Sequence, residues 1–269
     1  MNKKRGFTLV ELLVVIAIIA LLMSILMPAL ARVRVQAKVV ICQSNLRQWG
    51  AIFSMYTADN NSSFQEGWDT VGTSNWWMDS TKPYYSAGVA NEMGGSEIFF
   101  CPAAANRDKK VADGHVNFGI WDDRWLDNKG YEGSYGINGW VENKVKDREY
   151  PEMAPKRWRT DRVSGAAQVP LFMDAPWIDA WPEHFDEPPD LDNVDWRWQP
   201  ESHMSRFCKD RHNGYIDILF LDYTVRKIGL KEMWLLKWNR STELDGEWTT
   251  EGGVDPGDWP DWMQGFKNY

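Results

Sequence analysis

Three cysteines, Cys42, Cys101 and Cys208, carry the side chains best suited to covalent or metal chemistry in this chain of 269 residues. Their odd number excludes complete intramolecular pairing, although one disulfide could form in an oxidising compartment. The chain contains no CxxC pair, which argues against a zinc site built from cysteines. We therefore expect either a single disulfide or buried free thiols.

Two groups of polar residues further along the chain have the side chains of cation ligands. His203, Cys208, Asp210 and His212 lie close together in the sequence, but their spacing fits no standard zinc pattern. An acidic stretch supplies oxygen ligands of the kind that Ca²⁺ takes, without the order of an EF-hand. Its members are Glu183, Asp186, Glu187, Asp190, Asp192 and Asp195. We predict no metal site at named residues. Ca²⁺ in the acidic stretch is a secondary expectation, with a solvated loop as the alternative.

The sequence offers little for catalysis or for nucleic acid binding. It contains no GxSxG, no HExxH and no glycine-rich phosphate loop. Its 38 acidic residues make chance pairs of carboxylates inevitable, so pairing alone cannot indicate a glycosidase. The formal net charge of −8 argues against a sequence-independent grip on nucleic acid, which needs clustered Lys and Arg. We predict that the chain is not an enzyme and does not bind nucleic acid.

One carboxylate, Glu11, interrupts an apolar run from Phe7 to Met27. As a helix this run is long enough to cross a bilayer, where a charged side chain costs roughly 2.5–3.5 kcal/mol. A segment that served only as an anchor would avoid that cost, so we expect Glu11 to have a partner elsewhere. The basic residues at positions 3–5 predict a cytoplasmic N-terminus and an exported remainder. A removable secretory signal cut after Ala31 is the alternative.

The helical pattern continues beyond Pro28. Apolar residues recur there at spacings of three and four, which is one stripe of an amphipathic helix. The stripe consists of Val35, Val39, Cys42, Leu46, Trp49, Phe53 and Tyr56. Because proline removes a backbone donor, we expect a kink or a locally melted turn at Pro28. The pattern predicts a helix over residues 7–58, with a transmembrane stem at 7–27 and an amphipathic half packed on a globular head.

The hexapeptide GFTLVE, from Gly6 to Glu11, follows a short basic leader and opens the apolar run. It resembles the type III signal of type IV pilins and type II secretion pseudopilins. The resemblance implies a leader at residues 1–6, cleavage of the Gly6–Phe7 bond by prepilin peptidase, and N-methylation of Phe7. In that family, the glutamate at this position contacts the new N-terminal amine of a neighbouring subunit during assembly. Such a contact is physically sound, because a carboxylate and an ammonium attract strongly at low effective dielectric.

The head, residues 59–269, is predicted to be an α+β fold with an antiparallel sheet and long loops. Residues 97–101 and 169–173 are short apolar runs of the strand type, and residues 215–228 predict a β-hairpin. Residues 230–238 predict a short amphipathic helix. The 17 Trp residues would fill the core and pin the long loops, or mediate subunit or glycan contacts.

The C-terminal part is similar to a pseudopilin-like class that has large heads and a His-x9-Asp-Gly motif. His212, nine intervening residues and Asp222 carry this similarity, and a structural hydrogen bond between the two side chains is expected. Tyr223 stands where the class has glycine, so we expect a turn other than type I′, or a bulge. Major pseudopilins also carry a calcium-binding loop in the general region of the acidic stretch.

Cys42 and Cys101 are the cysteines best placed for a disulfide. Cys42 lies on the apolar stripe that faces the head, and Cys101 ends a strand-like run. A disulfide between them would clip the head to its stem and close a long loop, contributing roughly 4 kcal/mol. Two free thiols, or a pairing that involves Cys208, are the alternatives.

We interpret the chain as a structural subunit of a type IV pilus-like or type II secretion pseudopilus filament. Stems would bundle in the filament core and heads would form its shell, in an open helical assembly. The implied partners are further copies of the chain, minor pseudopilins, the inner-membrane assembly platform and prepilin peptidase. The implied location is the inner membrane, single-pass, with the head periplasmic or extracellular, and then the filament. An exported carbohydrate-binding or adhesive protein is the alternative, and it predicts exposed, coplanar Trp side chains.

Overall fold

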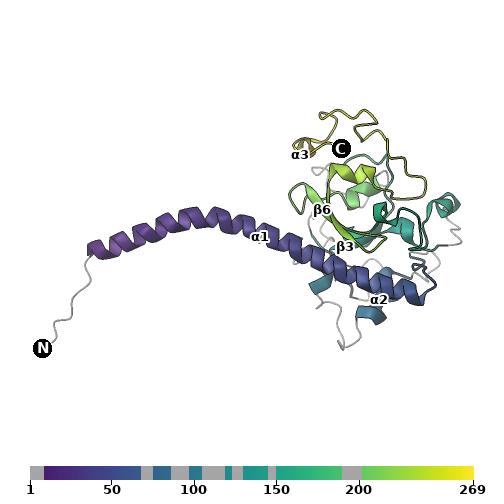
Figure 1. Ribbon diagram of the computed structural model, residues 1–269, viewed down its shortest axis with the longest axis horizontal. Coiled ribbons are helices and arrows are strands. Elements are labelled where there is room, and N and C mark those ends of the chain that lie inside the picture. The colour runs from purple at the N-terminus through teal and green to yellow at the C-terminus, as the bar shows by residue number, and fades with distance from the viewer. Residues whose placement is uncertain are drawn as a thin grey trace.

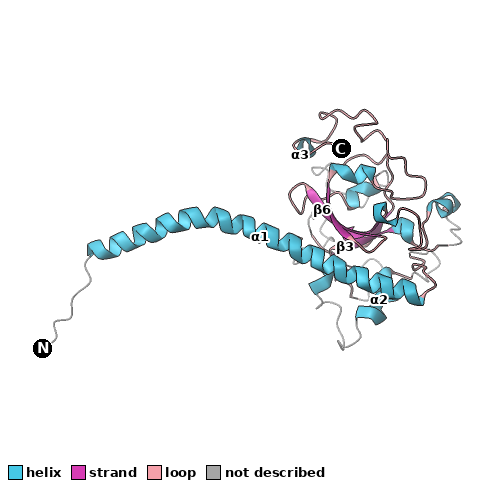
Figure 2. Ribbon diagram, in the orientation of Figure 1, coloured by secondary structure: helices cyan, strands magenta, loops and turns pink. Residues whose placement is uncertain are grey.

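A long helix and a head built around a five-stranded sheet make up the computed structural model of the chain (Figure 1). The structure describes residues 9–67, 75–85, 97–104, 119–122, 130–144, 150–189 and 202–269. The predicted leader and the Gly6–Phe7 junction lie outside these residues. Figure 2 shows the sheet inside the head, with loops forming much of the rest. The predicted α+β fold is confirmed.

Helix α1 spans Leu9–Asp59, close to its predicted range. Its side chains are exposed as far as Lys38, whereas one face is buried in the head from Cys42 onward. The buried members of the predicted stripe are Cys42, Leu46, Trp49, Phe53 and Tyr56. Val35 is exposed and Val39 is only partly buried, so the head covers the stripe about two turns later than predicted.

α1 continues through Pro28 without a break. The expectation of a locally melted turn at this proline is therefore wrong. Figure 1 shows the exposed stem following a gradual curve, not a sharp corner. Proline removes one backbone hydrogen bond, and the remaining bonds of the helix are sufficient to carry it past this position.

Five strands form one sheet in the order β5-β3-β4-β6-β7. Their bounds are Tyr135–Asn138 (β3), Pro170–Asp174 (β4), Asp179–Ala180 (β5), Tyr215–Phe220 (β6) and Val225–Gly229 (β7). Neighbouring strands are antiparallel except β3 and β5, which run parallel. The antiparallel prediction is wrong at this edge, because the chain turns after β4 and crosses to the far side of β3. A separate antiparallel pair is formed by β1 (Trp121–Asp122) and β2 (Glu132–Gly133).

The hairpin predicted over residues 215–228 is confirmed as β6 and β7. Tyr223 in its turn has a left-handed φ of 65°, a conformation that strains residues other than glycine. Its phenol oxygen lies 2.7 Å from Thr57 Oγ1 and donates to Asp161 Oδ2 at 2.8 Å. These bonds tie the turn to the end of α1 and offset the strain.

Helices replace or shorten two predicted elements. Residues 97–101, predicted as a strand, begin with the 3-10 helix η2 (Glu97–Phe99). The reason is a contact with α1. The Asn45 side chain donates to the carbonyls of Glu97 and Phe100, and carbonyls engaged in this way do not pair with a neighbouring strand. The helix predicted over 230–238 is the shorter 3-10 helix η9 (Lys231–Leu235). The other helices are α2 (Trp77–Tyr85), α3 (Asp261–Gln264), η4 (Gly139–Val141), η5 (Pro151–Lys156), η6 (Ala166–Gln168) and η8 (His203–Arg206).

Aromatic packing holds α1 against the sheet. The Trp49 ring centroid lies 5.1 Å from that of Trp77 and 5.3 Å from that of Phe172 on β4. Gly50 brings the helix close to β6, because a Cβ there would lie 3.0 Å from Leu219 Cδ1. Aromatic pairs of this kind contribute stability beyond the area they bury.

Most of the described Trp side chains are core residues. The buried ones are Trp49, Trp76, Trp77, Trp121, Trp140, Trp158, Trp234, Trp238 and Trp259. The partly buried ones are Trp177, Trp181, Trp248 and Trp262. Among the described residues no Trp is exposed, so this part of the head does not present the aromatic platform that the carbohydrate-binding alternative predicts. The described Trp residues thus fill the core, as expected.

Trp49→Ala should lower the free energy of unfolding by about 3–5 kcal/mol, because it leaves a cavity between helix and sheet. Met55→Ala, on the exposed face of the same helix, is the matched control and should change it by no more than about 0.5 kcal/mol. The measurement is urea unfolding of the full-length chain in detergent, followed by near-ultraviolet circular dichroism. Equal effects of the two changes would show that α1 is not held by this packing.

Candidate functional site

The first half of α1 presents an apolar surface on all sides. Large hydrophobic side chains are exposed along it from Leu9 to Ile41. By its length and composition, this helix is long and apolar enough to cross a membrane. Soluble monomers rarely expose a contiguous apolar patch of this size, and lipid or other helices are the surroundings that suit it. Glu11 is exposed on this surface.

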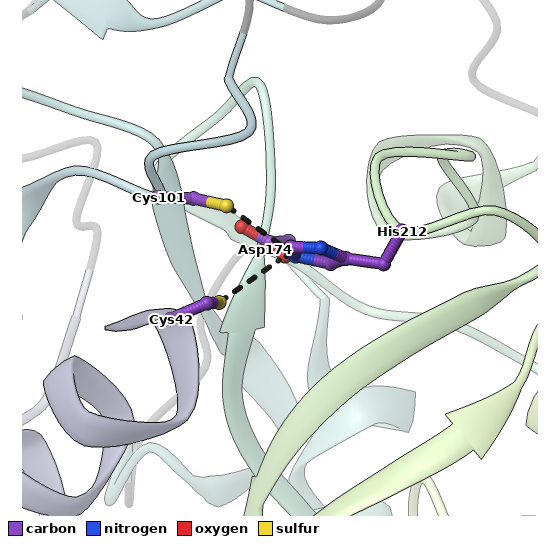
Figure 3. A group of neighbouring side chains, drawn as sticks. All are labelled: Cys42, Cys101, Asp174 and His212. Carbon is purple, nitrogen blue, oxygen red and sulfur yellow. Dashed lines mark hydrogen bonds and ion pairs between the residues drawn. The ribbon is translucent and has the colours of Figure 1, made fainter. Parts of the chain in front are cut away.

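Four buried side chains from four segments converge where α1 enters the head (Figure 3). α1 contributes Cys42, the first fully buried residue of its stripe, and β4 contributes Asp174, its last residue. Cys101 follows η2, and His212 precedes β6. We call these four residues the junction cluster. None of them is more than 4% exposed.

Ser134, the residue before β3, helps to position both loop members of the junction cluster. Its hydroxyl oxygen accepts a hydrogen bond from the backbone N–H of Cys101 at 2.7 Å. Its carbonyl oxygen accepts one from the Arg211 guanidinium, next to His212, at 2.8 Å. Arg211 also donates to the carbonyl of Gly119 at 2.8 Å. The loops that carry Cys101 and His212 are thereby anchored to one point of the sheet.

The polar atoms of the junction cluster lie close together. His212 Nε2 is 2.9 Å from Asp174 Oδ2 and 3.4 Å from Cys101 Sγ. Cys42 Sγ is 3.6 Å from the same Oδ2, and the four candidate ligand atoms all lie within 4.8 Å of one another. A second buried carboxylate faces them, since Asp217 Oδ2 lies 3.9 Å from His212 Nε2 and makes no hydrogen bond to any described residue.

The charges of the junction cluster are strongly coupled. Burial alone would raise the pKa of Asp174, but the hydrogen bond and charge of His212, together with Arg211, hold it below its ordinary value. Burial opposes the charging of His212, yet its bonds to Asp174 and Cys101 raise its pKa to about 10. Burial raises the pKa of Cys42. The pKa of Cys101 falls despite burial, because Cys42 and His212 hydrogen-bond to its sulfur. This set of two sulfurs, one nitrogen and one oxygen is chemically able to hold a cation.

The structure brings the predicted disulfide partners Cys42 and Cys101 together as free thiols, so their disulfide stays a prediction. Cys208 is a third buried free thiol and lies outside the junction cluster.

The expected hydrogen bond between His212 and Asp222 is wrong. Asp222 lies in the exposed hairpin turn, where its Oδ1 accepts from the backbone N–H and the hydroxyl of Thr224. His212 bonds to Asp174 because it precedes β6 and lies at the opposite end of that strand from the turn.

The junction cluster has no spacing signature in the sequence. Its members are widely separated in the chain, and spacing patterns detect only ligands that share a turn or a helix. Of the polar group noted around position 208, only His212 belongs to it, whereas Asp210 accepts a hydrogen bond from the backbone of Gly214. The one available signal was the position of Asp174, a carboxylate that ends an apolar strand.

The acidic stretch bonds two of its three described carboxylates, those of Glu183 and Asp186, within the protein. Glu183 accepts from Lys156 at 2.8 Å through Oε1 and from Asn239 at 2.7 Å through Oε2. Asp186 Oδ2 accepts from the backbone N–H groups of Met204 and Glu183. Residues 190–195 lie outside the described residues, so calcium binding by this stretch stays a prediction.

The buried carboxyl group of Asp186 makes the stability of the folded chain depend on pH. Burial raises the pKa of this carboxyl group to about 7. The folded chain therefore holds the proton more tightly than the unfolded chain, so the associated stability is present below about pH 4 and is lost as the pH rises through about 7. Asp186→Asn should reduce the fall in melting temperature between these limits, because an amide has no proton to lose in this range. The amide oxygen can still accept the same backbone hydrogen bonds, so the local structure is kept.

The control for this change is Asp245→Asn, at an exposed carboxylate. It should leave the pH dependence of the melting temperature as in the wild type. A pH dependence that is the same in Asp186→Asn and in the wild type would contradict the assigned role of burial.

A bare apolar stem that continues as the spine of a sheet-containing head defines a pilin-like class of protein. In agreement, residues 1–27 match the family model described as the prokaryotic N-terminal methylation motif. The chain is 44% identical to the type IV wide pilus major component PilA4 of Thermus thermophilus over 62 residues. This alignment covers 23% of the chain and 47% of PilA4. The alignment thus spans about half of that relative. No solved structure matches the chain significantly.

The motif, the similarity to PilA4 and the fold together identify the chain as a type IV pilin-like protein. The predicted resemblance to this superfamily is confirmed. The further assignment to the pseudopilin class with the His-x9-Asp-Gly motif stays a prediction.

Proposed function

We propose that the chain is a non-enzymatic structural subunit of a type IV pilus-like or type II secretion pseudopilus filament. The observation that carries the proposal is the exposed apolar stem, which begins within the matched methylation motif and bears a single carboxylate between Leu9 and Met27. Before assembly, the stem would anchor the subunit in the inner membrane, with the N-terminus cytoplasmic and the head periplasmic or extracellular. The similarity to PilA4 supports the same function.

Assembly would replace lipid around the stem with the stems of other copies. Lipid and apolar side chains are similar solvents, so stem packing alone supplies little specificity. A charge pair between Glu11 and the N-terminal amine of a neighbouring subunit supplies this specificity, because the two charges attract strongly at low dielectric and an unpaired charge is costly. This contact sets the axial register of each added copy. The contact repeats in one direction, so the assembly is open and helical.

The other partners follow from this assembly. Prepilin peptidase would cut between Gly6 and Phe7 and methylate Phe7. The inner-membrane assembly platform and minor pseudopilins would add subunits and begin the filament. Whether the filament is a pilus or a pseudopilus depends on its length and on these partners. The enlarged head favours neither.

The processing step predicts that the mature chain begins at N-methyl-Phe7. Mass spectrometry of the N-terminal peptide, from protein purified out of its native cell, measures this directly. A chain that begins at Arg32 would instead identify a secreted protein with a removed signal, and would overturn the proposed function.

Glu11→Val should abolish or strongly reduce filaments while sparing membrane insertion, because it removes the charge contact and leaves the stem apolar. Ser24→Ala is the matched control, since Ser24 lies on the same exposed stem and its hydroxyl bonds only locally to the carbonyl of Leu21. The measurements are the membrane fraction of each variant and the yield of sheared filaments. Normal filaments from Glu11→Val would count against the role given to this carboxylate.

A further inference from the structure

We propose that the junction cluster is a structural zinc site, in which Cys42, Cys101, Asp174 and His212 coordinate one Zn²⁺ ion and clip the stem to the head. The two sulfurs, one imidazole nitrogen and one carboxylate oxygen are the ligand types that Zn²⁺ takes in closed, four-coordinate sites. They come from α1, the segment after η2, the end of β4 and the loop before β6.

The geometry of the junction cluster suits a tetrahedral ion. Bonds of about 2.3 Å to sulfur and about 2.0 Å to nitrogen or oxygen place tetrahedral ligand atoms about 3.3–3.8 Å apart. His212 Nε2 lies 3.4 Å from Cys101 Sγ, and Cys42 Sγ lies 3.6 Å from Asp174 Oδ2. His212 Nε2 and Asp174 Oδ2, at 2.9 Å, need to separate by about 0.4 Å. The remaining pairs lie within 4.8 Å, so binding an ion needs movements of about 1 Å at most.

Neighbouring hydrogen-bond donors orient three of the four ligands, as is usual around metal sites. The Tyr135 hydroxyl donates to Cys42 Sγ at 3.3 Å, and the Ala103 backbone N–H donates to Cys101 Sγ at 3.4 Å. Arg211 donates to Asp174 Oδ1 at 3.2 Å and leaves Oδ2 directed at the other ligands. Each donor stabilises negative charge on its ligand, which favours thiolates and a carboxylate bound through one oxygen.

A buried carboxylate outside the ligand set also points to a cation. Asp217 is fully buried, its Oδ2 lies 3.9 Å from His212 Nε2, and within the described part of the chain this oxygen makes no hydrogen bond. Its Oδ1 accepts from Gln43, one residue along α1 from Cys42. Once the two thiols ionise, two thiolates and two carboxylates outnumber the positive charges of Arg211 and His212, and a divalent cation offsets this excess of negative charge.

A disulfide between Cys42 and Cys101 is the competing state of the same thiols. It uses only the sulfurs and gives no role to the carboxylate and the imidazole aimed at them. Disulfide sulfurs are also weaker acceptors than thiolates for the Tyr135 hydroxyl and the Ala103 N–H. The arrangement of donors around the sulfurs therefore favours coordination.

Coordination needs no oxidant. The thiols of Cys42 and Cys101 and the imidazolium of His212 lose their protons to solvent as their lone pairs bind the ion, and no electrons are transferred. The ion then links residues from four segments that otherwise meet through packing, hydrogen bonds and ion pairs. It would hold the head at a set angle on the stem.

The first test uses the full-length chain, purified in detergent under reducing conditions and supplied with Zn²⁺ or with Co²⁺. We expect about one Zn²⁺ per chain by elemental analysis and X-ray absorption distances typical of two sulfur and two lighter ligands. The Co²⁺ form should show thiolate-to-metal charge-transfer absorption and the intense visible bands of a tetrahedral ion. A reduced, folded chain that takes up neither metal would overturn the proposal.

Variants assign the ligands. Cys101→Ser removes a ligand and should weaken Zn²⁺ binding by more than the roughly 10–100-fold that loss of a hydrogen bond to a ligand costs. Tyr135→Phe removes such a hydrogen bond and should weaken Zn²⁺ binding by about tenfold or more. Cys208→Ser is the matched control, because Cys208 is equally buried and lies outside the junction cluster, and it should bind as the wild type does. Equal binding by Cys101→Ser and Cys208→Ser would overturn the proposal. If Cys101→Ser does not fold, the spectra of the wild-type Co²⁺ form decide.

The last test identifies the state in the cell. Intact mass and peptide mapping without reductant should find Cys42 and Cys101 as thiols in the native chain, together with bound Zn²⁺. A chelator should lower the melting temperature of the wild type and not that of Cys101→Ser. A native chain with a Cys42–Cys101 disulfide and no metal would refute the zinc site and confirm the disulfide. Neither result depends on whether the protein forms filaments.

Discussion

One continuous helix has to be stable in two environments, an apolar one around its stem and the core of its own head. The rest of the structure depends on how the helix meets both requirements. The stem of α1 is apolar on all sides and suits lipid or other stems. The second half of α1 is apolar on one face, which buries Trp49, Phe53 and their neighbours against β4 and β6. Because the helix is unbroken at Pro28, the position of the head follows from the position of the stem.

The helix enters the core of the head at Cys42, and buried polar side chains gather at this point. Strand β4 of the sheet ends beside the helix at the same point, with Asp174 as its last residue. Buried carboxylates and an imidazole are tolerable only when they are partnered. The junction cluster supplies those partners, and a coordinated ion would complete them. A rigid joint at this point suits a subunit whose stem is held inside a filament while its head contacts neighbours outside.

The large head is stabilised by aromatic side chains rather than by long strands. The strands of its sheet are short, and much of the described chain is loop and 3-10 helix. Indole groups cross these loops, as when the Trp158 and Trp140 N–H groups donate to the carbonyls of Trp238 and Pro182. Both of these Trp side chains are buried, and each fixes one carbonyl of a segment that lies beyond its own. Loops held in this way can differ in sequence without loss of the helix-on-sheet core.

The sequence by itself determined the features that depend on local periodicity and on short motifs. These are the apolar stem with Glu11, the amphipathic half of α1, the β6–β7 hairpin and the membership of the pilin-like superfamily. Only the tertiary structure decided the parallel β5 edge, the helical state of residues 97–99 and the bond from His212 to Asp174. Each of these depends on segments far apart in the chain. Their contacts repay the entropy of ordering only when the whole head is assembled, so no local pattern encodes them.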